Sequence, residues 1–513
     1  MKKYILLFLS FYFLITTLPA QRKYEFRAVW VATVDNIDWP STKDLTPDSQ
    51  RIEFIKLLDM HQRNGMNAVI VQIRPATDAF YPSQYEPWSE WLTGIQGHPP
   101  VPYYDPLAFM IAETHKRGME FHAWMNPYRA EFKIGVSSLS ATHITKLHPD
   151  WFLPYGSIRL FDPGNKEVQQ YVIQVVKDVV SRYDVDAIHF DDYFYPYRIA
   201  GKELPDSISF IKYGNGLSKD DWRRSNVDSI IHMLGVVIKN ENKFCKFGIS
   251  PFGVWRNIDK DPNGSNTKAG QTNYDDLYAN ILLWLKNKWI DYVAPQLYWE
   301  FSQKNVPFAT MIDWWAIHAY GRGLFIGHGI YKAFESRSAA WKNPNELPNQ
   351  IKKVREYPQM EGSIYFSSKS FDRNPNGWND SLQNNYYRYP AIIPPMPWID
   401  SIKPMPPVFS DAEVLKNESA EAIDLHLRLK NFSGNIKQYA IALFSKTGKF
   451  SGIPLYKLLP AQKDLFFSVA TGDLPVERDD FYILISAISK TNNESAYSHQ
   501  FNLSWDQTHW RID

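Results

Sequence analysis

Short strands and helices alternate along most of this 513-residue chain. Eight apolar segments rich in β-forming residues lie between residues 26 and 368, and helical patterns separate them. The eight segments are 26–33, 68–75, 120–127, 187–194, 247–255, 292–299, 324–331 and 362–368. Such alternation is typical of βα units around a parallel sheet. Eight units predict an α/β fold in which the sheet closes into a (β/α)8 TIM barrel.

The helical patterns carry start and stop signals of their own. One begins at Thr46 with a proline behind the cap and ends at Gly65, and another begins at Asp105 and ends at Gly118. Each ends one or two residues before the next strand, as the short connections of a barrel require. Longer segments follow the strands, at 74–104, 126–165 and 192–222. Because TIM barrels place their chemistry on the loops after the strands, this side is predicted to be functional.

A chain of this length exceeds one ordinary hydrophobic core, and a proline-dense stretch divides it. "PAIIPPMPWIDSIKPMPP", from Pro390 to Pro407, is too rich in proline for a helix or a central strand, so we expect a stiff linker at 393–407. The barrel is therefore assigned to 21–392. Alternating segments with turn signals follow the linker and predict a small all-β sandwich at 408–513. Its last strand pair resembles the end of fibronectin type III modules.

The N-terminal residues have the pattern of a secretory signal. Lys2 and Lys3 precede an apolar stretch at 4–18, and Ala20 stands at the expected cleavage site. A signal peptide at 1–20 predicts an exported protein, periplasmic or extracellular, with no stable membrane span after the signal is removed. The alternative is an uncleaved anchor, although the stretch is short for a full span of ~20 residues. Cys245 is the only cysteine, which excludes an intrachain disulfide.

Charge and aromatic content narrow the classes of ligand. Lys and Arg number 56 and Asp and Glu number 55, so the basic footprint of a nucleic-acid binder is missing and no nucleic-acid partner is expected. Aromatic residues make up 15% of the chain, and much of this excess lies beside loop signals. Clefts that stack sugar rings need such side chains. A polysaccharide is therefore favoured as the partner of the barrel.

Two adjacent aspartates, Asp191 and Asp192, end the apolar strand that begins at Ala187. Side chains alternate along a strand, so Asp191 should face the barrel axis at the strand's C-terminal end. Burying a carboxylate costs several kcal/mol unless it is paired, and barrel enzymes hold catalytic carboxylates at this position. The pair is therefore predicted to be functional. The structural alternative is that one aspartate caps the loop or pairs with Arg198.

The other strand ends supply aromatic and polar groups. Any one of these residues can be explained by packing or by a loop, but together they fall at strand C-termini, where a barrel builds its site. The predicted substrate-binding residues are Trp124, Asn126, Tyr128, Arg129, His189, Tyr193, Trp255, Arg256, Gln296, Tyr298 and Trp299. The aromatic rings would stack on sugars, and the polar groups would bond hydroxyls or acidic groups.

Motifs for other chemistries are absent from the sequence. It contains no GxSxG, no HExxH, no CxxC, no GxxxxGK[ST] and no GxGxxG after a strand. His122, His189 and His328 lie near strand ends and could form a metal site with Asp191, but they lack the close spacing that such sites often show. We therefore expect no metal and no cofactor.

Seven ordered motifs together resemble one known family. They are "EFRAVWVATVDNIDWPS", "HKRGMEFHAWMNPYR", "FDPG", "IHFDDYFYP", "DWRRSN", "GISPFGVWRN" and "APQLYW". Over residues 24 to 390 the chain resembles the glycosyl-hydrolase-like 10 family of bacterial envelope proteins. The resemblance implies a TIM barrel, glycoside hydrolysis and, from some family members, peptidoglycan glycan strands without peptides as the substrate. It also implies that the aspartates of "FDDYFYP" are acidic site residues.

Glycosidic cleavage generally uses two carboxyl groups, one as an acid and one as a nucleophile or base. We predict Asp191 as one partner and Asp192 as the leading second, with Glu300, Asp78 and Asp38 as further candidates. An N-acetyl group on the substrate is an alternative nucleophile. The competing hypothesis is a carbohydrate-binding protein without catalysis. The C-terminal module is expected to bind a glycan or a protein partner.

Overall fold

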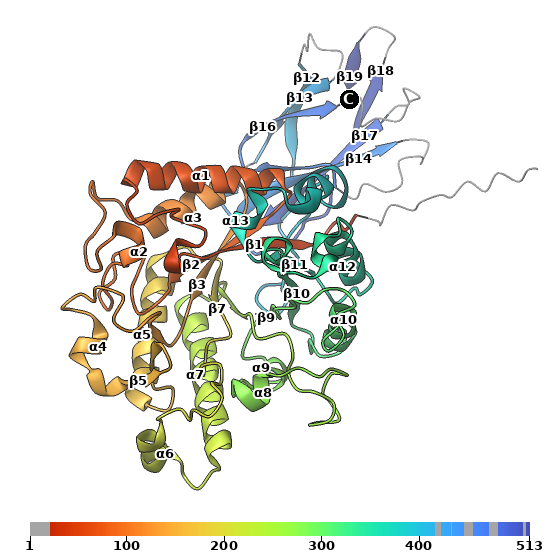
Figure 1. The fold of residues 1–513 in the computed structure, drawn as a ribbon. Helices are drawn as coiled ribbons and strands as arrows, with labels where there is room; N and C mark the ends of the chain where they lie inside the picture. The colour runs from red at the N-terminus through yellow and green to blue at the C-terminus, as the bar shows by residue number, and fades with distance from the viewer. Residues whose placement is uncertain (1–20, 416–421, 432, 446–454, 471–480, 506–508) are drawn as a thin grey trace, which may run out of the picture.

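A computed structural model confirms the predicted barrel. It describes residues 21–415, 422–431, 433–445, 455–470, 481–505 and 509–513, so the predicted signal at 1–20 lies outside the described residues. Eight parallel strands close into a barrel in the order β1-β11-β10-β9-β8-β7-β3-β2 (Figure 1). They are β1 Phe26–Val31, β2 Ala68–Arg74, β3 Glu120–Met125, β7 Ala187–Phe190, β8 Lys246–Ile249, β9 Tyr292–Val293, β10 Gly323–His328 and β11 Gly362–Tyr365. Each overlaps one of the eight predicted segments.

Helices follow the strands and cover the outside of the barrel (Figure 1). The longer ones are α1 Pro47–Arg63, α3 Pro106–Lys116, α5 Lys166–Arg182, α6 Ser207–Tyr213, α7 Lys219–Glu241, α9 Ile281–Lys286, α10 Phe308–Ala316 and α12 Glu346–Arg355. Short helices are α2 Glu90–Thr93, α4 Ile144–Leu147, α8 Asn273–Asp276, α11 Lys332–Glu335, α13 Ser368–Phe371 and α14 Trp378–Ser381. No helix among the described residues is both long and apolar enough to cross a membrane.

The predicted helix starts are confirmed by their caps. The Thr46 hydroxyl accepts the backbone N–H of Ser49, and the Asp105 carboxylate accepts that of Ala108. Such caps satisfy donors that the first turn of a helix leaves without partners. α1 is followed by Gly65 at a φ of +76°, a left-handed conformation that favours glycine.

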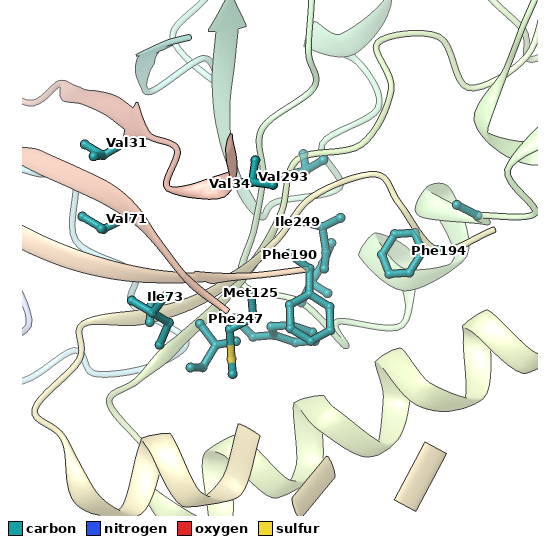
Figure 2. Close-up of a cluster of buried hydrophobic side chains, with 14 of the residues drawn as sticks. Val31, Val34, Val71, Ile73, Met125, Phe190, Phe194, Phe247, Ile249 and Val293 are labelled. Atoms are coloured by element: carbon teal, nitrogen blue, oxygen red, sulfur yellow. The ribbon is translucent and has the colours of Figure 1, made fainter. Parts of the chain in front are cut away.

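The main hydrophobic core lies between the barrel and its helices. Figure 2 shows outward-facing side chains from successive strands, among them Val31 of β1, Val71 of β2 and Phe190 of β7, gathered into one cluster above the helices. Alternation sends the other residues of each strand inward. Ala28, Ile70 and Phe325 belong to this second, inner core.

The long segment after β3 adds a small antiparallel sheet to the functional side. Its strands are β4 Arg129–Glu131, β5 Phe152–Tyr155 and β6 Ile158–Phe161, in the order β4-β6-β5. The sequence predicted only a long connection there. The sheet holds Arg129 in a fixed position, paired with Leu160 on β6.

The C-terminal module consists of two antiparallel sheets, as the sequence predicted. One has the order β12-β13-β16 and the other β15-β14-β17-β18-β19. Their strands are β12 Phe409–Val414, β13 Ala422–Leu429, β14 Ile436–Ser445, β15 Lys457–Pro460, β16 Asp464–Ala470, β17 Phe481–Ser489, β18 Phe501–Trp505 and β19 Trp510–Ile512. Leu425 and Leu465 of the first sheet share one core with Ile441 and Ile483 of the second.

This module packs against the barrel at the end opposite the functional loops. Asn492 donates a hydrogen bond of 2.7 Å to Glu120, the first residue of β3, and Ile392 forms an apolar cluster with Ile488. The start of the predicted linker also packs on the barrel, because Met396 joins the inner core and the Trp398 indole donates to Asp291 over 3.0 Å. The module therefore lies far along the barrel axis from the ends of the strands where chemistry is expected.

Candidate active site

Asp191 follows β7 directly and is held by three donors. The Trp124 indole N–H and the Asn126 amide each donate to its Oδ2 over 3.0 Å, and the backbone N–H of Tyr193 donates to Oδ1 over 3.2 Å. Its side chain lies 4% exposed. Burial raises the pKa of Asp191, while the nearby positive charge of Arg129 and these donors act in the opposite direction.

Asp192 begins the loop and lies in different surroundings. The Tyr197 hydroxyl donates to its Oδ2, and the Gln296 amide donates to its Oδ1 over 3.2 Å. Burial, followed by the negative charge of Asp191, raises the pKa of Asp192 to about 6. The predicted alternative of an Arg198 partner is not observed, since Arg198 lies 3.4 Å from Asp276 instead. The loop-capping alternative applies in part to Asp191, which accepts the N–H of Tyr193.

The structure brings several predicted residues together around this pair. Trp124, Asn126 and Gln296 contact the two carboxyl groups directly. Tyr298 lies close enough for the charges of both aspartates to affect its pKa, which burial already raises well above the ordinary value. Tyr193, Tyr298 and Trp299 are half-buried, so each keeps an exposed part for a ligand.

Three other predicted residues are buried within the protein. His189 faces the barrel axis below the site, where Tyr292 and Ser250 each lie 2.9 Å from one of its ring nitrogens. Tyr128 and Trp255 belong to the main core between strands and helices. The side chains of Tyr128 and Trp255 therefore pack in the hydrophobic core rather than at the open face of the site.

Arg256 and Glu300 are engaged by other partners. Arg256 forms a two-pronged ion pair with Asp275 at 2.8 and 3.0 Å and a second pair with Asp261. Glu300 accepts a hydrogen bond of 2.5 Å from Ser338. The contacts of Glu300 thus place it beside the loop after β10, away from the hydrogen bonds of the aspartate pair.

The two further carboxyl candidates connect loops. Asp38 accepts the Ala32 N–H and the Ser367 hydroxyl, both at 2.7 Å, and so ties the loop after β1 to the loop after β11; burial raises its pKa to about 6. Asp78 accepts the Ala76 N–H over 3.0 Å, and burial raises its pKa to about 7. Each carboxyl group has a clear role in shaping its loop.

The residues considered for a metal do not converge. His328 points out of the barrel, where Gln350 and Ser363 lie 2.8 and 3.0 Å from its ring nitrogens. His122 and His189 point inward, each 2.9 Å from the Tyr292 hydroxyl. Within the residues that the structure describes, no group of three or more His, Cys, Asp or Glu side chains is placed to hold a metal ion.

Sequence reasoning missed two residues at the site. Tyr197 donates to Asp192, and Phe252 packs edge-on against both Tyr197 and Trp299, with ring centroids 6.4 and 5.5 Å apart. The aromatic run "YFYPY" after the aspartates continues to Tyr197 and could have indicated it. Phe252 stands two residues after Ser250, at the end of another predicted strand, and carried the same signal.

Known proteins resemble this chain over most of its length. Glycosyl hydrolase YngK of Bacillus subtilis is 46% identical over 431 residues, which cover 83% of this chain and 83% of the relative. Glycosyl hydrolase DigH of Escherichia coli is 37% identical over 370 residues, which cover 67% of this chain and 83% of the relative. Among solved structures, the PgaB glycoside hydrolase domain of Bordetella bronchiseptica covers 71% of this chain and 99% of its own, with 12% identity and a TM-score of 0.45.

The sequence profile described as Glycosyl hydrolase-like 10 matches residues 25–342. That range holds the first seven strands of the barrel in chain order, including β7 with the aspartate pair. Together with the two relatives, this match shows that the chain belongs to the glycosyl hydrolase-like 10 family.

Proposed function

We propose that this protein is a glycoside hydrolase that cleaves glycosidic bonds of a polysaccharide with Asp191 and Asp192. The observation that carries the proposal is that two consecutive buried carboxyl groups lie in different surroundings. Asp191 accepts three N–H groups near a positive charge, whereas Asp192 lies beside a negative one. Two carboxyl groups in different surroundings can act as an acid and its ionised partner.

In this mechanism Asp192 is the general acid. With a pKa of about 6, it keeps a substantial protonated fraction at mildly acidic pH and gives its proton to the leaving glycosidic oxygen. Asp191 acts in its ionised form, which its N–H donors and the charge of Arg129 favour against burial, and stabilises the positive charge that develops at the anomeric carbon. Its three donors hold the carboxylate in place and reduce its power as a nucleophile.

The substrate is proposed to supply the nucleophile. On an N-acetylated sugar the acetamido oxygen can attack the anomeric carbon, as in substrate-assisted glycosidases. Water then attacks the anomeric carbon and opens the resulting ring, and its proton passes to the Asp192 carboxylate, which restores the acid and leaves the free reducing end. Because the acetamido group attacks the anomeric carbon, neither carboxyl group has to reach the opposite face of the sugar, and two carboxyl groups at one strand end are sufficient.

Glycan strands of peptidoglycan without peptides are the proposed substrate. The resemblance found in the sequence supports this choice, and the sugars of these strands carry the N-acetyl group that the mechanism uses. The secretory pattern at 1–20 supports export to the periplasm or beyond, where such a substrate is found.

Reducing-end release tests the proposal. Purified protein is incubated with peptide-free glycan strands, and new reducing ends are counted over time. Steady release by the wild type, lost in an Asp192→Asn variant, is the expected result. Binding of the strands without new reducing ends would instead establish the non-catalytic carbohydrate-binding protein.

The pH profile of kcat/KM is expected to be bell-shaped. Because Asp192 must be protonated, activity should fall as pH rises through about 6, and because Asp191 must be ionised, it should also fall in acid. The Tyr197 hydroxyl lowers the pKa of Asp192, so Tyr197→Phe should move the alkaline limb to higher pH. Tyr357→Phe is the matched control, since that hydroxyl donates to Asp313 on the outer surface. An alkaline limb that Tyr197→Phe leaves in place would contradict the role of Asp192.

A further inference from the structure

A row of side chains borders the aspartate pair. It runs from Arg129 through Tyr193, Tyr197 and Phe252 to Trp299. The Arg129 guanidinium lies 4.6 Å from the Tyr193 ring, Tyr193 stacks on Tyr197 at 5.3 Å, and the edge contacts of Phe252 complete the row. All five side chains are at least partly exposed. Partly exposed aromatic side chains in such a row suit contact with successive sugars.

The aspartate pair lies beneath the middle of this row. The Tyr193 backbone donates to Asp191, and the Tyr197 hydroxyl donates to Asp192. Arg129 stands at the Asp191 end, because its charge acts on the pKa of that residue, and Phe252 and Trp299 stand at the other end. A glycan lying along the row would therefore extend to both sides of the bond that is cut.

The guanidinium of Arg129 has unused donors. Within the described part of the chain its side chain forms no ion pair and no hydrogen bond; the rings of Tyr193 and Phe132 lie 4.6 and 5.4 Å from it, and its charge acts on the pKa of Asp191. By contrast, Arg256 and Arg223 are each paired with carboxylates. A guanidinium presents five N–H groups in a planar fork that matches a carboxylate. A half-buried arginine without such a partner is suited to take one from a ligand.

We propose that Arg129 binds the carboxylate of an acidic sugar in the subsite at the Asp191 end. The inference rests on the proposed function and adds the residue that recognises the carboxylate of the glycan. Two sources share this chemistry: a uronic acid, and a muramic acid whose lactyl group carries no peptide. Joining a peptide to the lactyl group turns the carboxylate into an amide, which removes the charge that Arg129 recognises. Arg129 would thus make the enzyme prefer strands without peptides.

The test compares one glycan with and without its charge. Peptide-free peptidoglycan strands are used as such and after their carboxyl groups have been converted to methylamides, and kcat/KM is measured on both. A charge-assisted hydrogen bond is worth about tenfold to hundredfold, so the wild type should prefer the acidic strands by about that factor. Arg129→Gln should bring the ratio close to one. The ratio is the readout because loss of Arg129 also changes the pKa of Asp191 and so lowers turnover of both strands.

Arg159→Gln is the matched control. Arg159 lies in the same small sheet, but its guanidinium is 3.0 Å from Glu131 and its ion pair is already complete. It should keep the wild-type ratio. Equal turnover of both strands by the wild type, or an unchanged ratio in Arg129→Gln, would overturn the proposal.

A binding measurement distinguishes failure of this inference from failure of the proposed function. Calorimetry with the Asp192→Asn variant measures the affinity for acidic and amidated strands without any turnover. If neither strand is cleaved but the acidic one binds more tightly in an Arg129-dependent way, the hydrolase proposal fails and the carboxylate site stands. Oligogalacturonate in a parallel titration distinguishes the source, since tighter binding of this probe would favour uronic acids over muramic acid.

Discussion

Asp191→Asn is expected to lower kcat by about 10²-fold or more while the melting temperature stays the same or rises. Asparagine keeps the shape of aspartate but carries no charge, so it cannot stabilise the positive transition state; acid–base and charge groups contribute on this scale. The three donors to Asp191 remain nearby, and a buried charge is removed, so the fold should not suffer. Reducing-end assays and thermal melting check the two halves of the expectation.

Asp291→Asn is the control for this substitution. Asp291 is also buried, but it stands before β9 at the far end of the barrel, where it accepts the Phe247 N–H over 2.8 Å and pairs with Lys239 at 2.7 Å. Its loss should lower stability and leave kcat unchanged. An Asp191→Asn protein with nearly normal turnover, or one that is inactive only because it unfolds, would return the aspartate to a structural role.

The barrel could be predicted because its signals are local. Each strand is a short apolar run, and each long helix has its own cap, as at Thr46 and Asp105. The small sheet that holds Arg129 had no such signal. Its strands have only three or four residues each, and they form because they pair with one another across the connecting segments. Tertiary contacts rather than local pattern decide segments of that kind.

At the site, the alternation of side chains along a strand predicted which residues point toward the barrel axis, but not how far along that axis each one lies. His189 on β7 and Asp191 directly after it point to the same side, yet Asp191 reaches the site and His189 lies one pleat lower, closed in by Tyr292. Likewise the pattern could not tell a free arginine from a paired one. Arg129 and Arg256 both follow strands, but only the fold brings Asp275 against the second.

Below the site, a chain of hydrogen bonds follows the barrel axis, and each group in it donates to the next group further from the site. The Trp30 indole can only donate, so His189 accepts at Nε2 and donates from Nδ1 to the Tyr292 oxygen. Tyr292 then donates to His122, and His122 donates from Nε2 to Glu120. Burial lowers the pKa of both histidines, which keeps them neutral, as this arrangement requires. The chain of bonds ends on a carboxylate at the face where the C-terminal module docks.

Glu120 needs nearby cations to stay ionised there. Lys246 lies 2.6 Å from it and Lys437 of the module 3.8 Å, and neither Glu120 nor Lys246 is appreciably exposed. Burial alone would raise the pKa of Glu120, but these charges and the His122 hydrogen bond hold it well below its usual value. The two partners on β3 and β8 are far apart in sequence, so the pair could not be predicted.

Lys246→Met is therefore expected to lower the free energy of unfolding by about 3–5 kcal/mol, the usual cost of leaving one member of a buried ion pair behind. Lys177→Met, which removes an exposed pair with Glu241, should cost about 1 kcal/mol or less.

The loss of stability in Lys246→Met should be largest near neutral pH. In the wild type the lowered pKa of Glu120 adds stability that is lost as pH falls. In the variant Lys437 and the His122 hydrogen bond still oppose burial but Lys246 no longer does, so that pKa rises and acid protonates Glu120 more readily, which relieves its incompletely paired charge. Adding Glu120→Gln to Lys246→Met should restore most of the loss at pH 7, because Gln keeps an acceptor for His122 without a charge. Denaturant unfolding at pH 7 and pH 5 measures each difference, and a double variant as unstable as the single one would show that Lys246 acts by packing rather than by charge.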